Sequence, residues 1–481
     1  MTSQDGKCRN PTALLVVICL AQFMVILDIS IVNVALPSIG DGLGFSATGL
    51  QWVVNAYTLT FAGFLMLGGR ASDLLGRRRV FLVGIAIFGT SSLVCAAAQG
   101  QGVLLGARAV QGLGAAIISP ASLAIIASSF DEGPERNRAM GMWSAMAGLG
   151  GSSGVLLGGV LTQAFDWPAI FLINAPVAVA VVAAGRALIP RDGEPTLERD
   201  FDLAGAVTVT LGLTALVYGV VRTDALGWGS AGVLLPFAAS VVLLAGFVWI
   251  ETRFANAPIV PFAIFRNRSL RAANLVILLL GSALFAMWFF ISLFLQQVLG
   301  HGALETGLDF LPMTLSIVVA ATVAPRLVNR FGARAVLTAG MLLATLGLGL
   351  LTGVSTDGSY ASLVLPGGLL AAIGLGTSMV PATIAAVQGV DRSLSGLASG
   401  MINTSRLIGG AVGLAALTTL ATSHANSEVA SGTAPLVAQA DGYQLAFAAG
   451  AGLCLIGAIA AAVMLRPSRA ERLGEPIAES G

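Results

Sequence analysis

Apolar residues gather in long runs separated by short polar segments along the whole chain. Most runs reach the roughly 20 residues that an α-helix needs to cross about 30 Å of hydrocarbon. The pattern predicts an all-α polytopic membrane protein. Its fourteen predicted transmembrane helices lie at residues 12–36, 48–69, 80–99, 103–127, 139–163, 168–189, 203–221, 231–250, 271–297, 306–326, 334–353, 361–387, 396–421 and 443–465.

The composition excludes several classes of protein. Charged residues make up 10% and hydrophobic residues 56% of the 481 residues, and the mean hydropathy is +0.88. Because soluble domains carry about 25% charged residues, an ordinary cytoplasmic enzyme or a nucleic-acid-binding protein is excluded. The only lysine is Lys7, so the chain holds no Gly-Lys-Ser/Thr phosphate loop for ATP-driven transport. The four cysteines lack metal-ligand spacing, and we expect neither a metal nor a bound cofactor.

Basic residues are distributed very unevenly between the two sides of the predicted helices. With the N-terminus in the cytoplasm, 22 of the 25 Lys and Arg residues fall in cytoplasmic segments. Only Arg222 falls in an outer loop, while Arg108 and Arg406 fall within helices. An excess of Lys and Arg in cytoplasmic loops sets the orientation of membrane proteins. We therefore predict a multi-pass protein of a bacterial plasma membrane with both termini in the cytoplasm.

A weak internal repeat divides the chain into two parallel six-helix halves. GRASDLLGRR at 69–78 aligns with PRLVNRFGAR at 325–334, and GLG at 112–114 is similar to GLG at 374–376. Duplicated halves around a central site are a transporter architecture. The predicted parts are an N-terminal tail at 1–11, a first half at 12–190, inserted helices 7 and 8 at 191–252, a second half at 253–465 and a C-terminal tail at 466–481.

Few charged residues fall deep inside predicted helices, where each costs roughly 2.5–3.5 kcal/mol. They are Asp28, Arg108 and Arg406, with Asp309 about one turn inside its helix. Arginine keeps its proton in proteins, whereas burial can neutralise an aspartate. Asp28 is therefore the candidate proton carrier and Arg108 the candidate fixed counter-charge. A static ion pair that fastens two helices is the alternative interpretation.

Polar and aromatic side chains follow helical spacing on several predicted helices. Arg108 and Gln111 share a polar face on one helix, and Asn403 and Arg406 share one on another. Such a face lines water, a ligand path or a partner helix. For the aromatic helix at 271–297, packing against lipid or core is the alternative. The candidates for a substrate cavity are Asn33, Trp52, Asn55, Tyr57, Gln111, Phe289, Gln296, Asp309, Asn403 and Arg406.

Glycine recurs at close spacing in the predicted helix at 139–163. Gly150, Gly154, Gly158 and Gly159 fall there, and small residues four apart let helix backbones approach closely. The same residues lower the cost of bending a helix. The cluster therefore indicates one of two roles. It allows either tight packing of this helix, or bending of the helix that changes which side of a central cavity is sealed.

Several segments, in chain order, have the form of family signature motifs. They are LDISIVNVALP at 27–37, GRASDLLGRRR at 69–79, RAVQGLG at 108–114, GGSSGVLLGG at 150–159, and DW at 166–167 followed by IFLINAP at 170–176. These segments resemble the motifs of the fourteen-span drug:proton antiporter branch of the major facilitator superfamily, and the likeness extends from the first predicted helix to the last.

This resemblance implies roles for particular residues. Asp28 would be the protonation site and Arg108 its partner. Asp73, Gly76 and Arg77 would belong to a latch on the cytoplasmic side, and the glycine motif would make the direction of transport export. The family also implies a monomer that needs no cofactor, because the proton gradient drives transport.

The chain departs from the family pattern at two positions. Val155 stands where the glycine motif usually carries proline, and Asn329 stands where the second copy of the loop motif would carry an acidic residue. The first departure leaves the bending role of the motif open. The second restricts the full latch to the first copy.

The predicted function is proton-coupled antiport that exports hydrophobic or amphipathic small molecules, such as drugs or antibiotics, by alternating access. A scarcity of acidic residues inside the helices argues against a dedicated pump for dicationic drugs. A proton-coupled uptake symporter is the main alternative. A polytopic membrane enzyme or a sensor fits less well, because the loops offer no paired carboxylates with histidine and the C-terminal tail is short.

Overall fold

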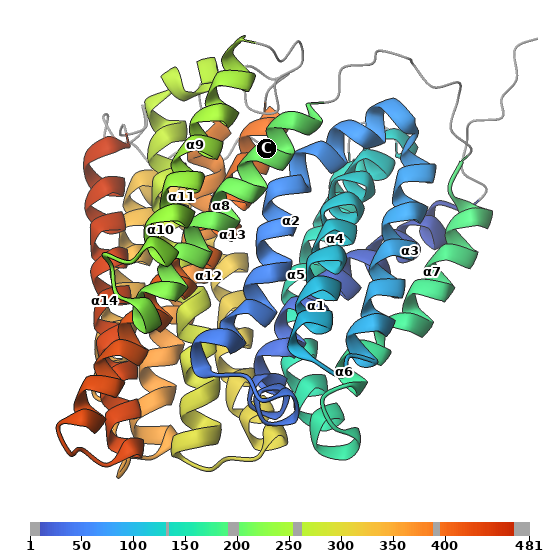
Figure 1. Ribbon diagram of the computed structural model, residues 1–481. Coiled ribbons are helices and arrows are strands. Elements are labelled where there is room, and N and C mark those ends of the chain that lie inside the picture. The colour runs from blue at the N-terminus through green and yellow to red at the C-terminus, as the bar shows by residue number, and fades with distance from the viewer. Residues whose placement is uncertain (1–9, 131–133, 191–201, 254–261, 388–394, 466–481) are drawn as a thin grey trace, which may run out of the picture. The chain divides into compact units, whose positions relative to one another are not determined.

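The computed structural model describes residues 10–130, 134–190, 202–253, 262–387 and 395–465, and the regular elements within them are helices (Figure 1). Each predicted apolar run coincides with one or more of them along most of its length. Two π-helical turns, Phe294–Val298 and Tyr360–Val364, adjoin α10 and α12. The α-helices are α1 (Pro11–Leu43), α2 (Ala47–Leu75), α3 (Arg77–Ala96), α4 (Gln101–Ser129), α5 (Pro134–Phe165), α6 (Ala169–Leu172), α7 (Asn174–Leu188), α8 (Leu203–Leu226), α9 (Ala231–Arg253), α10 (Arg268–Leu293), α11 (Ala303–Leu351), α12 (Leu365–Val387), α13 (Ser395–Ala430) and α14 (Pro435–Met464).

The predicted class, an all-helical membrane protein, is confirmed. Among the described residues, ten segments are long and apolar enough to cross a membrane. One of them, α11, has 49 residues and covers two predicted helices, which are separated by a break at Gly332. The helices α2, α5 and α8 are not among the ten, so the number of fourteen spans stays a prediction.

The chain folds as two compact units. Unit 1 comprises Met1–Thr214, Ser240–Val260 and Gly302–Gly307, and unit 2 comprises Ala215–Ala239, Pro261–His301 and Leu308–Gly481. Three of the five boundaries between the units fall within α8, α9 and α11. The predicted division into two halves with two inserted helices stays a prediction.

In unit 1, α4 packs between α2 and α3, and α1 packs against α5 and α7 (Figure 1). Glycines make the close approaches possible. Gly112 of α4 faces the backbone of Tyr57 in α2, and a Cβ added at Gly114 would lie 2.8 Å from the backbone nitrogen of Phe88 in α3. Without a side chain at these points, α4 can carry buried polar groups to the centre of the unit.

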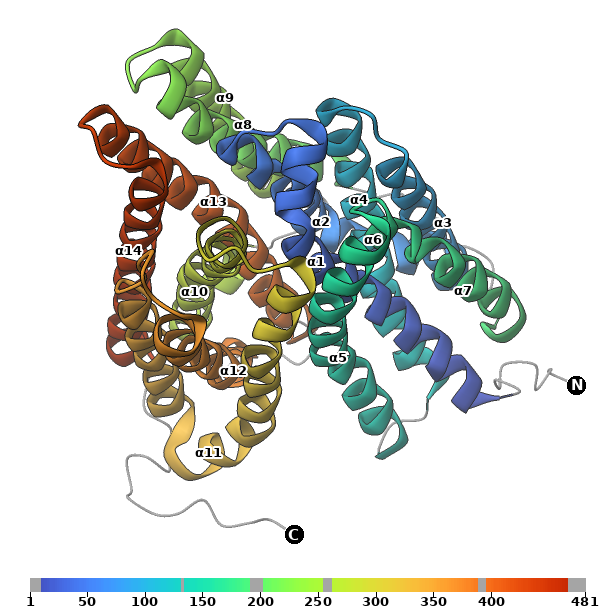
Figure 2. The same ribbon diagram turned by 90° about the horizontal axis from the view of Figure 1, so that it is seen from below.

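In unit 2, α10 packs against α12, α13 and α14 (Figure 2). Its contact with α13 is again a close backbone approach, because Gly409 faces the carbonyl of Leu278 and Gly413 faces the backbone of Ser282. Ser282 Oγ donates a hydrogen bond of 2.9 Å to the carbonyl oxygen of Gly409. The two helices are therefore held at short distance along several turns.

The backbone places a glycine of similar conformation in both copies of the first repeated segment. Gly76 and Gly332, which the repeat aligns, have φ of 97° and 81°, a region that favours glycine. In the second pair of segments, Gly112 faces α2 and Gly114 faces α3, whereas Gly374 faces the second part of α11 and Gly376 faces its first part. The similarity of this second pair stays a prediction.

Candidate functional site

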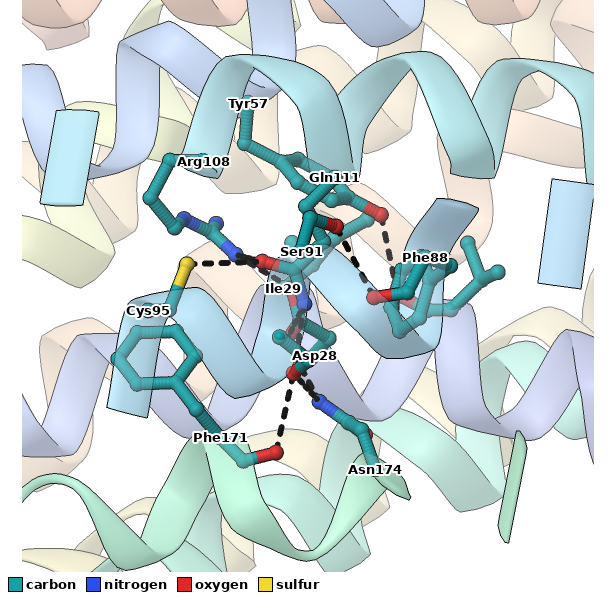
Figure 3. Close-up of polar contacts among 12 residues, drawn as sticks. Asp28, Ile29, Tyr57, Phe88, Ser91, Cys95, Arg108, Gln111, Phe171 and Asn174 are labelled. Carbon is teal, nitrogen blue, oxygen red and sulfur yellow. Dashed lines mark hydrogen bonds and ion pairs between the residues drawn. The ribbon is translucent and has the colours of Figure 1, made fainter. Parts of the chain in front are cut away.

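The deep charges predicted in the first six helices meet in one buried cluster (Figure 3). Asp28 of α1 and Arg108 of α4 form an ion pair of 2.5 Å between Oδ2 and Nη1. Their side chains are 0% and 2% exposed. The structure thus joins the two residues that the sequence singled out, from helices that are distant along the chain.

The other oxygen of the Asp28 carboxylate accepts two further hydrogen bonds. Gln111 Nε2 donates to Oδ1 over 2.8 Å and Asn174 Nδ2 over 2.9 Å. With Arg108, three donors from α4 and α7 converge on this carboxylate. The arrangement suits an ionised carboxylate, because a protonated one would have to donate a hydrogen bond itself.

Arg108 is held on all sides by the same cluster. Its Nη1 also donates to Gln111 Oε1 over 2.8 Å, and its Nε donates to the carbonyl oxygen of Val53 over 3.0 Å. The guanidinium lies over the ring of Tyr57, at 4.4 Å from the centroid, and 5.8 Å from that of Phe171. Aromatic faces attract cations, so these rings compensate part of the lost hydration.

Ser92 of α3 connects the amides of the cluster. Its hydroxyl accepts from Gln111 Nε2 over 3.1 Å and from Asn174 Nδ2 over 3.0 Å, and it donates to the carbonyl oxygen of Phe171 over 3.0 Å. Ser92 and Asn174 are not among the site residues predicted from the sequence. Asn174 lies in the motif at 170–176, which was a usable signal, whereas nothing distinguishes Ser92 from its neighbour Ser91.

A buried ion pair such as Asp28–Arg108 is weak evidence for a contribution to stability. A buried ion pair is often no more stable than apolar residues of the same volume, because removing two charges from water costs about as much as their attraction returns. Breaking such a pair by removing one partner costs about 3–5 kcal/mol. The cluster is therefore sensitive to any change in the charge of either residue.

The two adjacent serines provide a test of the network. We expect Ser92→Ala to destabilise the protein by about 1–3 kcal/mol, because Phe171 and two amide groups lose a buried partner. Among the described residues, Ser91 donates to carbonyls of its own helix, which keep their backbone hydrogen bonds, so Ser91→Ala should destabilise the protein by less than about 1 kcal/mol. Thermal unfolding of the two purified variants compares them, and equal effects would contradict the role given to Ser92.

The glycine motif of α5 packs against the turn of α1 that carries Asp28. Gly154 faces the Ser30 side chain and the Leu27 carbonyl, and a Cβ added at Gly158 would lie 2.8 Å from the Ile31 carbonyl oxygen. A Cβ added at Gly150 would lie 3.0 Å from Ile26 Cβ, while Gly159 faces the backbone of Ala303 within the same unit. α5 is continuous through Val155. The motif therefore makes close packing beside Asp28 possible, and its role in bending stays a prediction.

The substrate-cavity candidates of α1 and α2 have different surroundings. Tyr57 and Gln111 belong to the Asp28 cluster described above. Asn33 is partly exposed and donates to the carbonyl oxygen of Ile29 in its own helix, and Trp52 is also partly exposed. Asn55 is fully buried, and neither atom of its amide group has a hydrogen-bond partner in the described part of the chain. A role of these residues in substrate binding stays a prediction.

The candidates of α10, of the π-helical turn that follows it and of α11 lie in unit 2. Phe289 is buried, with its ring centroid 5.5 Å from that of Phe290, and Gln296 donates to Ser292 Oγ over 3.2 Å. Asp309 Oδ2 lies 2.7 Å from His301 Nδ1. This contact was not predicted, because the sequence around a histidine near a helix end does not indicate its partner.

The candidates of α13, Asn403 and Arg406, lie together. Arg406 Nη2 donates to Asn403 Oδ1 over 3.0 Å, and its guanidinium carbon lies 5.8 Å from the centroid of the Phe285 ring. Both residues are partly exposed. The predicted polar stripe on this helix therefore contains a direct hydrogen bond.

The predicted latch surrounds the junction of α2 and α3. Gly76, with φ of 97° and ψ of 130°, separates the two helices, and Arg77 is the first residue of α3. The side chain of Asp73 lies outside the described residues. Its proposed role in a latch stays a prediction.

A comparison with protein families decides the classification. Residues 18–414 match the Major Facilitator Superfamily. The chain belongs to this superfamily. Members of the superfamily are membrane transporters, so this superfamily member is a transporter and not an enzyme.

Relatives in the superfamily share much of the sequence. The chain is 41% identical to the cephamycin export protein CmcT of Amycolatopsis lactamdurans, over 89% of this chain and 90% of that protein. It is 38% identical to the puromycin resistance protein pur8 of Streptomyces alboniger, over 98% and 95% of the two chains. It is 32% identical to the tetracenomycin C resistance and export protein of Streptomyces glaucescens, over 86% and 77%.

A solved structure extends the comparison to the fold. The POT family transporter PepTSo aligns with a TM-score of 0.68 at 16% identity, over 97% of this chain and 99% of that one. At this identity the likeness concerns the fold alone. It agrees with membership of the superfamily.

Proposed function

We propose that this transporter is a proton-coupled antiporter that exports hydrophobic or amphipathic small molecules, antibiotics among them, across a bacterial plasma membrane. The names of its relatives, which are export and resistance proteins for antibiotics, support the direction and the substrate class. The observation that carries proton coupling is the buried Asp28–Arg108 pair. The proton gradient supplies the energy, so the mechanism requires no cofactor or metal.

The proposed cycle depends on a change in the hydrogen bonds of Asp28. A proton that arrives from outside neutralises the carboxylate, which then no longer accepts from Arg108, Gln111 and Asn174 together. Its attraction for Arg108 falls, and α1 and α4 lose the ion pair that joins them. A proton shifts a conformational equilibrium only by its different affinity for the two states, and the ion pair supplies that difference.

The second half of the cycle exchanges the two ligands. The substrate leaves on the outer side, the transporter changes the side on which it is open, and Asp28 releases its proton to the cytoplasm. The close contact of α5 with the Asp28 turn of α1 supports a mechanical link between protonation and movement. The latch formed by Asp73, Gly76 and Arg77 would act on the cytoplasmic side.

The proposal includes the topology and the assembly. Fourteen spans with both termini in the cytoplasm follow from the distribution of 22 of the 25 basic residues, and we expect a monomer. Reporter fusions after residue 222 and at the C-terminus test the topology. An enzyme that is active only outside the cytoplasm should work at the first position and fail at the second. The opposite pattern would contradict the orientation.

Transport into proteoliposomes tests the function directly. A transporter inserted so that its cytoplasmic side faces outward should concentrate a fluorescent amphipathic compound when the lumen is more acidic than the bath. An ionophore that exchanges protons for potassium should abolish this accumulation. If accumulation instead requires the opposite pH gradient, the protein is a symporter, and if no gradient affects it, proton coupling is excluded.

A further inference from the structure

Arg406 lies near the middle of the membrane-spanning part of unit 2. Its backbone packs against Gly281 of α10, where an added Cβ would meet the backbone of Arg406. Gly281 follows Arg268, the first residue of α10, by 13 positions, or about 20 Å at 1.5 Å per residue. Since the hydrocarbon layer is about 30 Å thick, both backbones lie well inside it.

The positive charge of Arg406 has no acidic partner in the described part of the chain. Its guanidinium donates to the neutral amide of Asn403 over 3.0 Å and lies 5.8 Å from the centre of the Phe285 ring. The nearest acidic residue along its own helix is Glu428, 22 positions away, or about 33 Å. The neighbouring helix α10 contains no acidic residue, and neither does α12.

This situation is the opposite of that of Arg108. The charge of Arg108 is balanced by Asp28, so the cluster in unit 1 is neutral overall. An unbalanced charge in hydrocarbon costs several kcal/mol, and headgroups at a distance of about 15 Å are beyond the reach of an arginine side chain. An arginine also keeps its proton, so it cannot reduce this cost by becoming neutral.

We propose that Arg406 and Asn403 form a subsite for the carboxylate of an amphipathic substrate. The inference rests on the proposed function, because it names a substrate class for the same transporter. The planar guanidinium matches a carboxylate with two parallel hydrogen bonds. Asn403 accepts from Arg406 through Oδ1, and its Nδ2 donates to no described residue, so the amide can add a further hydrogen bond to the ligand.

The aromatic residues of α10 suit the apolar body of such a substrate. Phe285 of α10 packs over Gly410, which lies one turn after Arg406 on α13. Trp288 follows Phe285 by one turn on α10. Both rings are only partly buried, whereas Phe289 and Phe290 fill the interior of the unit. A flat apolar surface beside a cation is the combination that an aromatic or polycyclic acid requires.

The subsite stands on a rigid support. Ser405, the residue before Arg406, donates to Asn274 Oδ1 over 2.7 Å, and Gly409 lies against the Leu278 carbonyl. α13 therefore cannot rotate about α10 without losing these contacts. A site that is held in place before the ligand arrives loses less entropy on binding.

Binding of matched acids and esters tests the subsite. The probes are dansylglycine and 1-pyrenebutyrate, each with its methyl ester, titrated by fluorescence into the full-length protein in nanodiscs of neutral lipid. The wild type should bind each acid about tenfold or more tightly than its ester, which corresponds to a difference of about 1.4 kcal/mol in binding free energy. Arg406→Gln should remove this preference and leave ester binding within about twofold.

Two further variants separate charge from structure. Arg406→Lys keeps the charge without the planar fork, and its preference for the acid should be intermediate. Arg222→Gln replaces an exposed arginine of the same unit that bonds to Tyr218, and its preference should equal that of the wild type. Equal binding of acid and ester to the wild type, no binding of either, or an unchanged preference in Arg406→Gln would overturn the proposal.

The anion subsite and proton coupling can fail independently, and the binding and transport measurements distinguish the two failures. Preferential binding of the acids without transport driven by a pH gradient would support the anion subsite and contradict the antiporter. Gradient-driven transport of the esters without preference for the acids would support the antiporter and contradict the anion subsite.

Discussion

Asp28→Asn is expected to abolish proton-driven accumulation of substrate while the protein stays folded in the membrane. The amide has nearly the same shape as the carboxylate and can still accept a hydrogen bond from Arg108 Nη1, but it cannot bind and release a proton near neutral pH. The variant therefore resembles the protonated transporter permanently. Its transport under a pH gradient should fall to the level of protein-free vesicles.

The charge of Arg108 determines how stable this variant is. Loss of the carboxylate leaves the guanidinium without a counter-charge, and breaking a buried ion pair costs about 3–5 kcal/mol. Asparagine recovers part of this cost through the remaining hydrogen bond. The double variant Asp28→Asn with Arg108→Gln removes both charges, so it should melt at a higher temperature than Asp28→Asn alone and remain inactive.

A second aspartate on the same helix is the matched control. Asp41 lies in the last turn of α1 and is exposed, so Asp41→Asn should transport at the rate of the wild type. Accumulation by Asp28→Asn at that same rate would show that another group carries the proton. The proposal of export would survive this result if a pH gradient still drove transport.

Hydropathy and charge were sufficient to predict an all-helical chain and to single out Asp28 and Arg108, which the structure buries. An apolar run of membrane length has few alternatives to a helix, because backbone groups in lipid must bond within their own segment. A charge inside such a run is conspicuous for the same reason, which is why Asp28, Arg108 and Arg406 were identified. Their partners were harder to predict.

Partners from other helices depend on tertiary packing, which a local pattern does not contain. Asn174 contacts Asp28 across 146 positions of the chain, and Ser92 contacts Phe171 across 79. Ser91 and Ser92 have the same local sequence context, yet only Ser92 joins the cluster. The break at Gly332 falls between the predicted helices at 306–326 and 334–353, so the sequence indicated this boundary, although α11 continues closer to the glycine on both sides than predicted.

The glycines of α5 were visible in the sequence, but their specific neighbours were not. Spacing alone allowed either tight packing or bending. The structure adds that Gly150, Gly154 and Gly158 face successive parts of the α1 segment around Asp28. Gly151, between them, faces open space. Because Gly154 faces α1 and Gly151 does not, substitutions at these two positions can test the role of the packing.

Gly154→Ala is expected to destabilise the protein and to impair transport strongly. Its new Cβ would overlap Ser30 Oγ and lie 2.7 Å from the Leu27 carbonyl oxygen, so α1 and α5 must separate. Overpacking of this kind costs about 1–3 kcal/mol. If this cost falls on one transport state and not on the other, it changes their populations about 5- to 150-fold, and transport should fall. Thermal unfolding and proton-driven uptake measure the two effects.

Gly151→Ala provides the control, because it adds the same methyl group to the same helix. With nothing within 4 Å, this methyl group should stabilise the helix by about 0.5–1 kcal/mol and leave transport unchanged. Adding Ser30→Ala to Gly154→Ala removes the nearest clash but keeps the Leu27 carbonyl in place, so we expect partial recovery. Equal behaviour of the alanine variants at 151 and 154 would mean that close packing of α5 on the Asp28 turn has no part in transport.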